Sequence, residues 1–224
     1  IIFEGNNKWM LSANGTIFTY EYEAIIPGLL KRWYAERQEM QQKMRDCGDN
    51  EIEREYWDKR QLVKKINLHS LYGAILNPGC RFFDIRIGQR VTLTGRCITK
   101  HMGAKINEII AGKYDHKGQS VVYGDTDSVY FTAHKALQKE IESGKIPWNK
   151  ESVITLYDKI AEETNTSFTG FMTKAFHCPS TRGSVIKAGR ELVASKGLFI
   201  TKKRYAVLYY LSLIHISEPT RPST

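Results

Sequence analysis

The sequence predicts an α+β fold in which an antiparallel pair of helices extends from a body of antiparallel sheet with packed helices. Two long segments, near 27–45 and 51–71, carry apolar residues at helical spacing and are separated only by a short polar break. Two short β-rich segments flank Gly124–Asp127, which predicts a β-hairpin. Two more β-rich segments follow at 184–192 and 198–210. Strands grouped apart from long helices are typical of an α+β fold.

The composition is that of a folded chain with surplus positive charge. The 224 residues are 42% hydrophobic and 25% charged, which excludes wholesale disorder, collagen and a coiled-coil rod. This length allows one domain or two small ones. Lys and Arg number 33 against 24 Asp and Glu, and the net charge of +9 suggests a nucleic acid or an acidic membrane as partner, or simply solubility.

The composition disfavours a disulfide-rich protein and a membrane-spanning protein. The four cysteines show no metal-ligand or redox spacing, so we expect a reducing compartment rather than a disulfide framework. No apolar run is long enough to span a membrane, and no basic amphipathic helix suited to a membrane surface stands out, so no membrane partner is expected.

The elements can be followed in order along the chain. Asn14-Gly15 predicts a turn next to a strand at 16–20, and Pro27 suits the start of the first helix. Cys47–Asn50 breaks the helical spacing before the second helix. We divide the chain into a first piece of the body (1–24), the helical hairpin (25–77), the remaining body (78–210) and a tail (211–224).

Beyond Pro78-Gly79 the body is expected to alternate helices with strands. A third helix is predicted near 88–111, followed by a polar loop at 112–118. Another helix is predicted at 151–176. The strands are expected at 120–123, 128–131, 184–192 and 198–210.

The strongest chemical signal is the pair Asp125 and Asp127 at the tip of the predicted hairpin. Residues two apart on a strand share a face, so we expect both carboxylates on one side. Close carboxylate oxygens suit Mg²⁺, which binds one or two carboxylates together with substrate phosphates. The alternative is an ordinary turn, because Asp and Gly favour turns.

Two further groups of residues could contact phosphates. Gln61, Lys65, His69 and Tyr72 share one face of the second helix, although a solvated helix face would look the same. Lys202-Lys203-Arg204-Tyr205 places three cations in a predicted strand, where they could contact a nucleic-acid backbone or merely protect a sheet edge.

Together these motifs resemble the family B DNA polymerases, with the branch of tailed phages closest. Tyr123-Gly-Asp-Thr-Asp-Ser128 resembles the third polymerase motif of that family, and Lys65-Ile-Asn-Leu-His-Ser-Leu-Tyr-Gly73 resembles the second. Lys202–Tyr205 matches the Lys-Lys-Arg-Tyr motif, and Ile25–Arg37 resembles the opening of the fingers. All four occur in the order of the family, over residues 12–210.

The resemblance implies a palm with an antiparallel two-helix fingers hairpin, and a two-metal transfer of nucleotides from dNTP to a primer 3′-hydroxyl. Two Mg²⁺ ions, primer-template DNA and dNTP would be bound, and a sliding clamp could be a partner through regions outside this chain. If a phage encodes the protein, it would work in the bacterial cytoplasm. The implied site residues are carboxylates for metal (Asp125, Asp127 and, less firmly, Glu191), nucleotide contacts (Arg37, Lys65, His69, Tyr72, Gly73) and duplex contacts (Lys202, Lys203, Arg204, Tyr205).

The chain also departs from the family pattern. The first polymerase motif, Asp-x-x-Ser-Leu-Tyr-Pro-Ser, is absent from the 224 residues, so we expect a fragment that lacks this motif, the exonuclease and the thumb and that is inactive alone. His69 replaces an Asn of the family, and Gln41 stands where a Lys is common.

Leu211–Arg221 resembles a translated sequencing adapter, which would make 211–224 non-native; the alternative is a strand end followed by a loop. The alternative function for the whole chain is a non-catalytic nucleic-acid-binding protein with a polymerase-like core.

Overall fold

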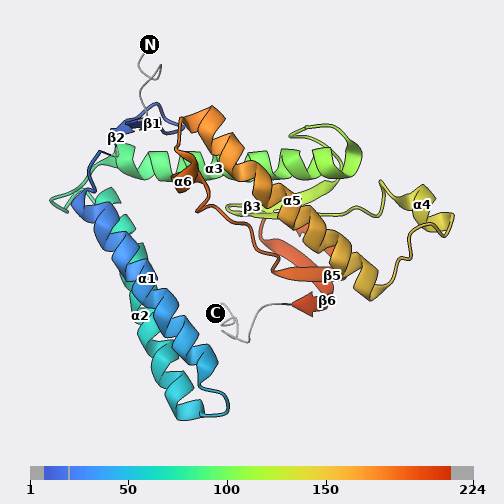
Figure 1. Cartoon of the computed structure of the whole chain (residues 1–224), viewed down its shortest axis with the longest axis horizontal. Coiled ribbons are helices and arrows are strands. Elements are labelled where there is room, and N and C mark those ends of the chain that lie inside the picture. The colour runs from blue at the N-terminus through green and yellow to red at the C-terminus, as the bar shows by residue number, and fades with distance from the viewer. Residues whose placement is uncertain (1–7, 20, 213–224) are drawn as a thin grey trace. The chain divides into compact units, whose positions relative to one another are not determined.

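A computed structural model describes residues 8–19 and 21–212, and the chain divides into two compact units, residues 1–93 and 94–224. Long helices and short antiparallel strands make up the described residues, which confirms the α+β class (Figure 1). None of the described helices has the length and apolar character needed to cross a lipid bilayer. Each unit is considered by itself below.

The first unit begins with a small β-hairpin, β1 (Trp9–Leu11) and β2 (Ile17–Thr19). The turn between them contains Gly15 at φ +82°, and Gly15 N donates to Ser12 O at 2.9 Å, as the Asn14-Gly15 pair predicts. Asn14 Nδ2 donates to Arg86 O at 3.1 Å, and the Arg90 guanidinium lies 3.6 Å from the centre of the Phe18 ring. These contacts hold the hairpin against the first turns of α3 (Ile85–Ala111).

The helical hairpin consists of α1 (Ile25–Asp46) and α2 (Glu51–Leu76), which lie side by side (Figure 1). The second helix runs five residues beyond the predicted end at Leu71. Asn50 caps it by accepting the Glu53 N–H at 3.2 Å, and Gly48 takes a left-handed φ of +54° in the turn. The polar break at Cys47–Asn50 therefore acts as predicted.

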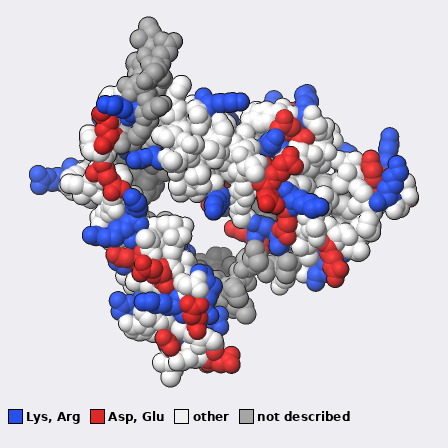
Figure 2. Space-filling view, in the orientation of Figure 1, with Lys and Arg blue, Asp and Glu red and all other residues white. Residues whose placement is uncertain are grey.

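Polar and cation–ring contacts join α1 to α2, and α1 has no buried residue. Lys64 pairs with Glu36 and lies over the Trp33 ring, and Lys43 Nζ lies 4.6 Å from the centre of the Trp57 ring. Figure 2 shows acidic and basic side chains interleaved over this hairpin, with neither sign forming a continuous patch.

The second unit is built on α3 and α5 (Lys150–Phe176). Ile106 of α3, Ile160 of α5 and Ala133 form a buried cluster. Residues of β3 (Val121–Asp125) and β4 (Ser128–Phe131) pack against it, namely Val121, Val129 and Phe131. The buried residues of α5 recur on one face, which the helical spacing predicts (Val153, Ile160, Thr164, Phe168, Met172, Phe176).

The loop before β3 is fixed by a buried amide on α3. Asn107, only 2% exposed, donates through Nδ2 to Asp115 O at 2.8 Å and accepts the Ser120 N–H at 3.1 Å. A Cβ on Gly118 would lie 2.4 Å from Asn107 Cγ, so the loop passes this amide only because residue 118 is glycine. The carboxylate hairpin is thereby tied to α3.

The strands of the described residues form three separate antiparallel pairs: β1–β2, β3–β4, and β5 (Leu192–Thr201) with β6 (Arg204–Ser212). Two short helices, α4 (Gln138–Glu142) and α6 (Ser180–Gly183), have no counterpart in the sequence prediction. The last two residues of β6 fall in the predicted tail, and the rest of the tail lies outside the described residues.

Two strand predictions are wrong. Residues 184–191 contain no strand, because Asn165 of α5 bonds the backbone of Ala188 in place of a neighbouring strand: Ala188 N donates to Oδ1 at 2.7 Å and Nδ2 donates to Ala188 O at 2.9 Å. Residues 198–210 are not one strand, because the chain turns back at Lys202-Lys203.

Candidate functional site

The two aspartates occupy a tight turn between β3 and β4. Asp125, the last residue of β3, pairs with Ser128, the first residue of β4, so Thr126 and Asp127 form the connecting loop. Thr126 takes a left-handed φ of 50°, a conformation that residues with a Cβ rarely adopt. Because Asp127 lies in the turn and not in a strand, strand alternation does not place it on the same face as Asp125.

Hydroxyl groups on either side hold this turn. Ser128 Oγ donates to Asp125 O at 3.1 Å. Thr99 Oγ1, on α3, lies 3.1 Å from Thr126 O and from Gly95 O, so its one proton is shared between the two carbonyls. The turn is therefore supported from α3 as well as from its own strands.

Asp125 has polar partners within the fold. Its side chain is 19% exposed; its Oδ1 lies 3.8 Å from Lys202 Nζ and accepts the Thr126 hydroxyl at 3.2 Å. Lys202 belongs to the turn between β5 and β6. Asp125, a predicted metal ligand, is thus paired with Lys202, a predicted duplex contact.

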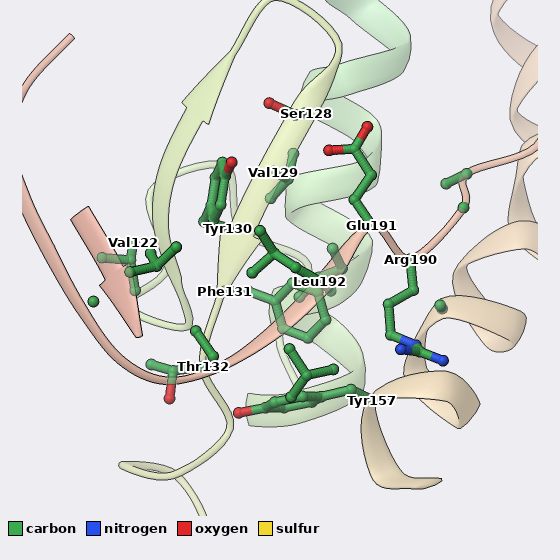
Figure 3. A pocket seen from close by; sticks show the side chains of 18 of the residues that line it. Val122, Ser128, Val129, Tyr130, Phe131, Thr132, Tyr157, Arg190, Glu191 and Leu192 are labelled. Carbon is green, nitrogen blue, oxygen red and sulfur yellow. The ribbon is translucent and has the colours of Figure 1, made fainter. Parts of the chain in front are cut away.

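Asp127 and Glu191 both line a cavity of about 580 Å³ in the second unit. Its walls come from α3, β4, α5 and the segment 187–197. In Figure 3 the Glu191 side chain points toward the end of the hairpin that carries Ser128, whereas Arg190 points toward α5. Two exposed carboxylates from distant parts of the sequence are therefore brought to one cavity, and Asp125 is not among the residues that line it.

Arg190 fixes the segment that carries Glu191. Its guanidinium pairs with both carboxylate oxygens of Asp158 on α5. Nη1 is buried and has no hydrogen-bond partner among the described residues. The sequence analysis missed this pair, because nothing local links residues 158 and 190.

No group of three His, Cys, Asp or Glu side chains in the described ranges is close enough to hold a metal ion by itself. Of the predicted set, Asp127 and Glu191 line the cavity, and Asp125 Oδ1 lies 3.8 Å from Lys202 Nζ.

The basic motif lies in a turn, which corrects the expectation that it forms part of a strand. Lys202 and Lys203 connect β5 to β6, and Arg204 and Tyr205 begin β6. Lys203 has φ 63°, in the left-handed region. All four side chains are exposed, and a turn presents its cations to a partner more openly than a strand would.

An aromatic cluster joins this turn to the carboxylate hairpin. It consists of Tyr123, Tyr130, Phe199 and Tyr205, whose ring centres lie 5.2 to 5.8 Å apart. The hydroxyls of Tyr130 and Tyr205 are 2.9 Å apart, and Lys203 N donates to Tyr123 Oη at 2.8 Å. Burial and then the Tyr205 hydroxyl raise the pKa of Tyr130 well above its ordinary value. The sequence analysis missed the cluster, although each member lies in or beside a motif.

The predicted nucleotide contacts belong to the first unit. Arg37 of α1 donates from Nε to Gln61 Oε1 at 3.1 Å, which joins it to the predicted face of α2. Lys65 and His69 are exposed on α2, and His69 Nδ1 donates to Lys65 O at 2.7 Å. His69 Nε2 therefore has no proton when the ring is neutral and could accept a hydrogen bond.

Tyr72 and Gly73 lie near the end of α2. Tyr72 Oη donates to Gly88 O at 3.1 Å and so connects α2 to the start of α3. A Cβ on Gly73 would meet no atom within 4 Å, so nothing in the described chain requires glycine there.

Comparison with known proteins gives the same family that the sequence motifs resemble. The sequence model described as DNA polymerase family B matches residues 6–217. A DNA polymerase of Pyrococcus glycovorans is 28% identical over 205 residues, which is 88% of this chain and 25% of that protein. The DNA-directed DNA polymerases of Escherichia phage RB69 and Enterobacteria phage T4 are 36% and 37% identical over 84 and 82 residues, 37% and 35% of this chain but 9% of each phage protein. The chain thus spans a quarter or less of these relatives, and its match extends over nearly all of its own length: it belongs to family B of the DNA polymerases.

Proposed function

We propose that this chain is the palm and fingers part of a DNA-directed DNA polymerase that transfers a nucleotide from dNTP to a primer 3′-hydroxyl. The primer oxygen would bond to the α-phosphorus while the bond to the departing pyrophosphate breaks. The second unit would be the palm and the α1–α2 hairpin the fingers. Primer-template DNA and dNTP would be the partners, and a bacterial cytoplasm the place of work if the gene is of phage origin.

The observation that carries this proposal is the arrangement around the β3–β4 hairpin. Asp127 and Glu191 line one cavity, and the Lys202–Arg204 turn is joined to the same hairpin through Asp125 and Tyr123. A polymerase needs a cation site and a grip on the duplex backbone close to each other. These contacts bring candidate groups for both tasks onto one scaffold.

The donor set at the cavity suits magnesium. Asp127 and Glu191 offer hard carboxylate oxygens, and Mg²⁺ commonly binds through one or two carboxylates together with substrate phosphates. Asp127 and Glu191 would hold the metal, and Asp125 would orient the turn beside it. When bound, magnesium would neutralise phosphate charge and make the primer hydroxyl more acidic. A second ion would take its other ligands from the phosphates and from polymerase segments beyond this chain.

The remaining predicted residues would orient the substrates. Arg37 and Lys65 are cations that would attract the triphosphate, and His69 could accept a hydrogen bond through Nε2. Tyr72 would form a wall of the nascent base-pair pocket, with Gly73 allowing close approach. Lys202, Lys203 and Arg204 would contact duplex phosphates, so duplex affinity should fall steeply with salt.

Magnesium-dependent nucleotide binding tests the proposal. A fluorescent dNTP is titrated with the 224-residue chain, with and without Mg²⁺, and its anisotropy is recorded. We expect Mg²⁺ to tighten binding and Asp127→Asn to remove at least about tenfold of that gain, because one carboxylate ligand is lost. Lys65→Ala should weaken binding at every Mg²⁺ concentration, since a phosphate contact is lost.

Glu162→Gln is the matched control, because it removes an exposed carboxylate of α5 that does not line the cavity. It should bind nucleotide as the unaltered chain does. Salt-dependent duplex binding without any Mg²⁺-dependent nucleotide binding would contradict the proposal and would favour a non-catalytic nucleic-acid-binding protein.

A further inference from the structure

The turn that carries the basic motif has a backbone conformation that needs outside support. Lys203 has φ 63°, which is rare for a residue with a Cβ, and neither Gly nor Asn occupies the turn. Such conformations persist where surrounding contacts determine them. A partner for this turn should therefore exist elsewhere in the fold.

Tyr123 supplies that partner from the carboxylate hairpin. Its hydroxyl accepts the Lys203 N–H at 2.8 Å, although the two residues are 80 positions apart. Its ring stacks on Phe199 at 5.4 Å and lies 5.6 Å from the Tyr205 ring, so residues on both strands leading to the turn contact it. Tyr123 therefore holds both the backbone of the turn and its base.

Tyr123 also lies in the strand that leads to the proposed metal-binding turn. Tyr123 lies in β3, and Asp125 ends that strand, where its carboxylate lies 3.8 Å from Lys202 Nζ. A shift of the basic turn would therefore change the position of Asp125 and of the neighbouring Asp127.

We propose that Tyr123 is a positioning residue for duplex binding, whose hydroxyl sets the geometry of the Lys202–Arg204 turn relative to the carboxylate hairpin. This inference rests on the proposed function, because it takes the turn to be a contact for the DNA backbone. In this role Tyr123 would act through the Lys203 amide, whose N–H its hydroxyl accepts.

The test is duplex binding by the 224-residue chain carrying Tyr123→Phe, which removes only the hydroxyl. Anisotropy of a fluorescein-labelled primer-template is measured at several salt concentrations. The dissociation constant should rise by about 2- to 10-fold, the effect of one lost hydrogen bond. The slope of affinity against salt should not change, because no cation is removed. Hydrogen exchange at the Lys203 amide should become faster.

Two further variants serve as controls. Tyr114→Phe also removes one tyrosine hydroxyl from a hydrogen bond in the second unit, here with His101 Nδ1 at 2.8 Å, and it should leave the duplex dissociation constant unchanged. Arg204→Ala should weaken binding and reduce the salt slope by about 0.9, as expected for one phosphate contact.

The outcomes separate the inference from the function on which it rests. Normal affinity of Tyr123→Phe, together with weak binding by Arg204→Ala, would overturn the positioning role and leave the proposed function intact. Equal weakening by Tyr123→Phe and Tyr114→Phe would also overturn it, because the effect would then be general. If Arg204→Ala binds duplex normally, the assignment of the turn as a DNA contact fails first.

Discussion

Gly118→Ala tests how firmly the loop before β3 is held by the buried amide of Asn107. The added methyl would lie 2.4 Å from Asn107 Cγ and 2.7 Å from both Nδ2 and Oδ1. Asn107 is 2% exposed and bonds Asp115 O and Ser120 N. The amide therefore has no room to yield while it keeps both bonds.

The cost follows from those two bonds. A buried polar group that loses its partner destabilises a protein by about 1–3 kcal/mol. With some relaxation of the exposed loop, we expect the free energy of unfolding to fall by about 2–4 kcal/mol, a large part of the roughly 5–15 kcal/mol typical of a domain. At about 3 °C per kcal/mol for a unit of this size, the melting temperature should drop by about 6–12 °C.

Urea and thermal unfolding followed by far-UV circular dichroism measure this difference. Gly170→Ala is the matched control, because a Cβ there meets no atom within 4 Å and alanine favours the interior of α5. It should raise stability by about 0.5–1 kcal/mol. An unfolding curve of Gly118→Ala that overlies that of the unaltered chain would refute the steric argument.

Two other predictions concern residues that support the second unit. Burial lowers the pKa of His101 below its ordinary 6.5, so the stability contributed by its neutral ring is complete above that pH and is lost as pH falls through the lowered value. His101→Gln should therefore show a smaller acid-induced loss in urea unfolding than the unaltered chain, and identical pH profiles would contradict this account. Asn165→Ala should speed hydrogen exchange at the Ala188 amide and lower stability by about 1–3 kcal/mol, because the 2.7 and 2.9 Å bonds to Ala188 are lost. Unchanged exchange at that amide would show that the segment is held by other contacts.

The long helices α1, α2, α3 and α5 were predicted from the sequence, because their signals are local. The spacing of apolar residues that predicts each helix lies within that helix. In the structure, Asn50 and Asn149 cap α2 and α5 from the residue just before each helix. The hairpin around Asp125 was likewise indicated by short-range turn chemistry. These features depend on neighbours within a few residues, and the structure contains them.

Strand positions that depend on distant partners could not be predicted in the same way. The Ala188 segment looks like a strand because of Val185 and Ile186, yet its backbone is bonded by Asn165 from α5. The turn at Lys203 carries no glycine signal, and its amide is satisfied by Tyr123, 80 positions away. In both places a side chain from a distant part of the sequence bonds the backbone and fixes its conformation. Local sequence patterns cannot indicate such a partner.

The two aspartates of the turn show why composition alone does not assign roles. They are alike in the sequence, but Asp125 is 19% exposed and lies within 3.8 Å of Lys202 Nζ, whereas Asp127 is exposed and lines the cavity with Glu191. A carboxylate that already has an ammonium partner and a hydroxyl donor is less available to a metal than an exposed one that faces a cavity. These contacts favour Asp125 as a support for the basic turn, and they support our proposal that Asp127 would hold the metal.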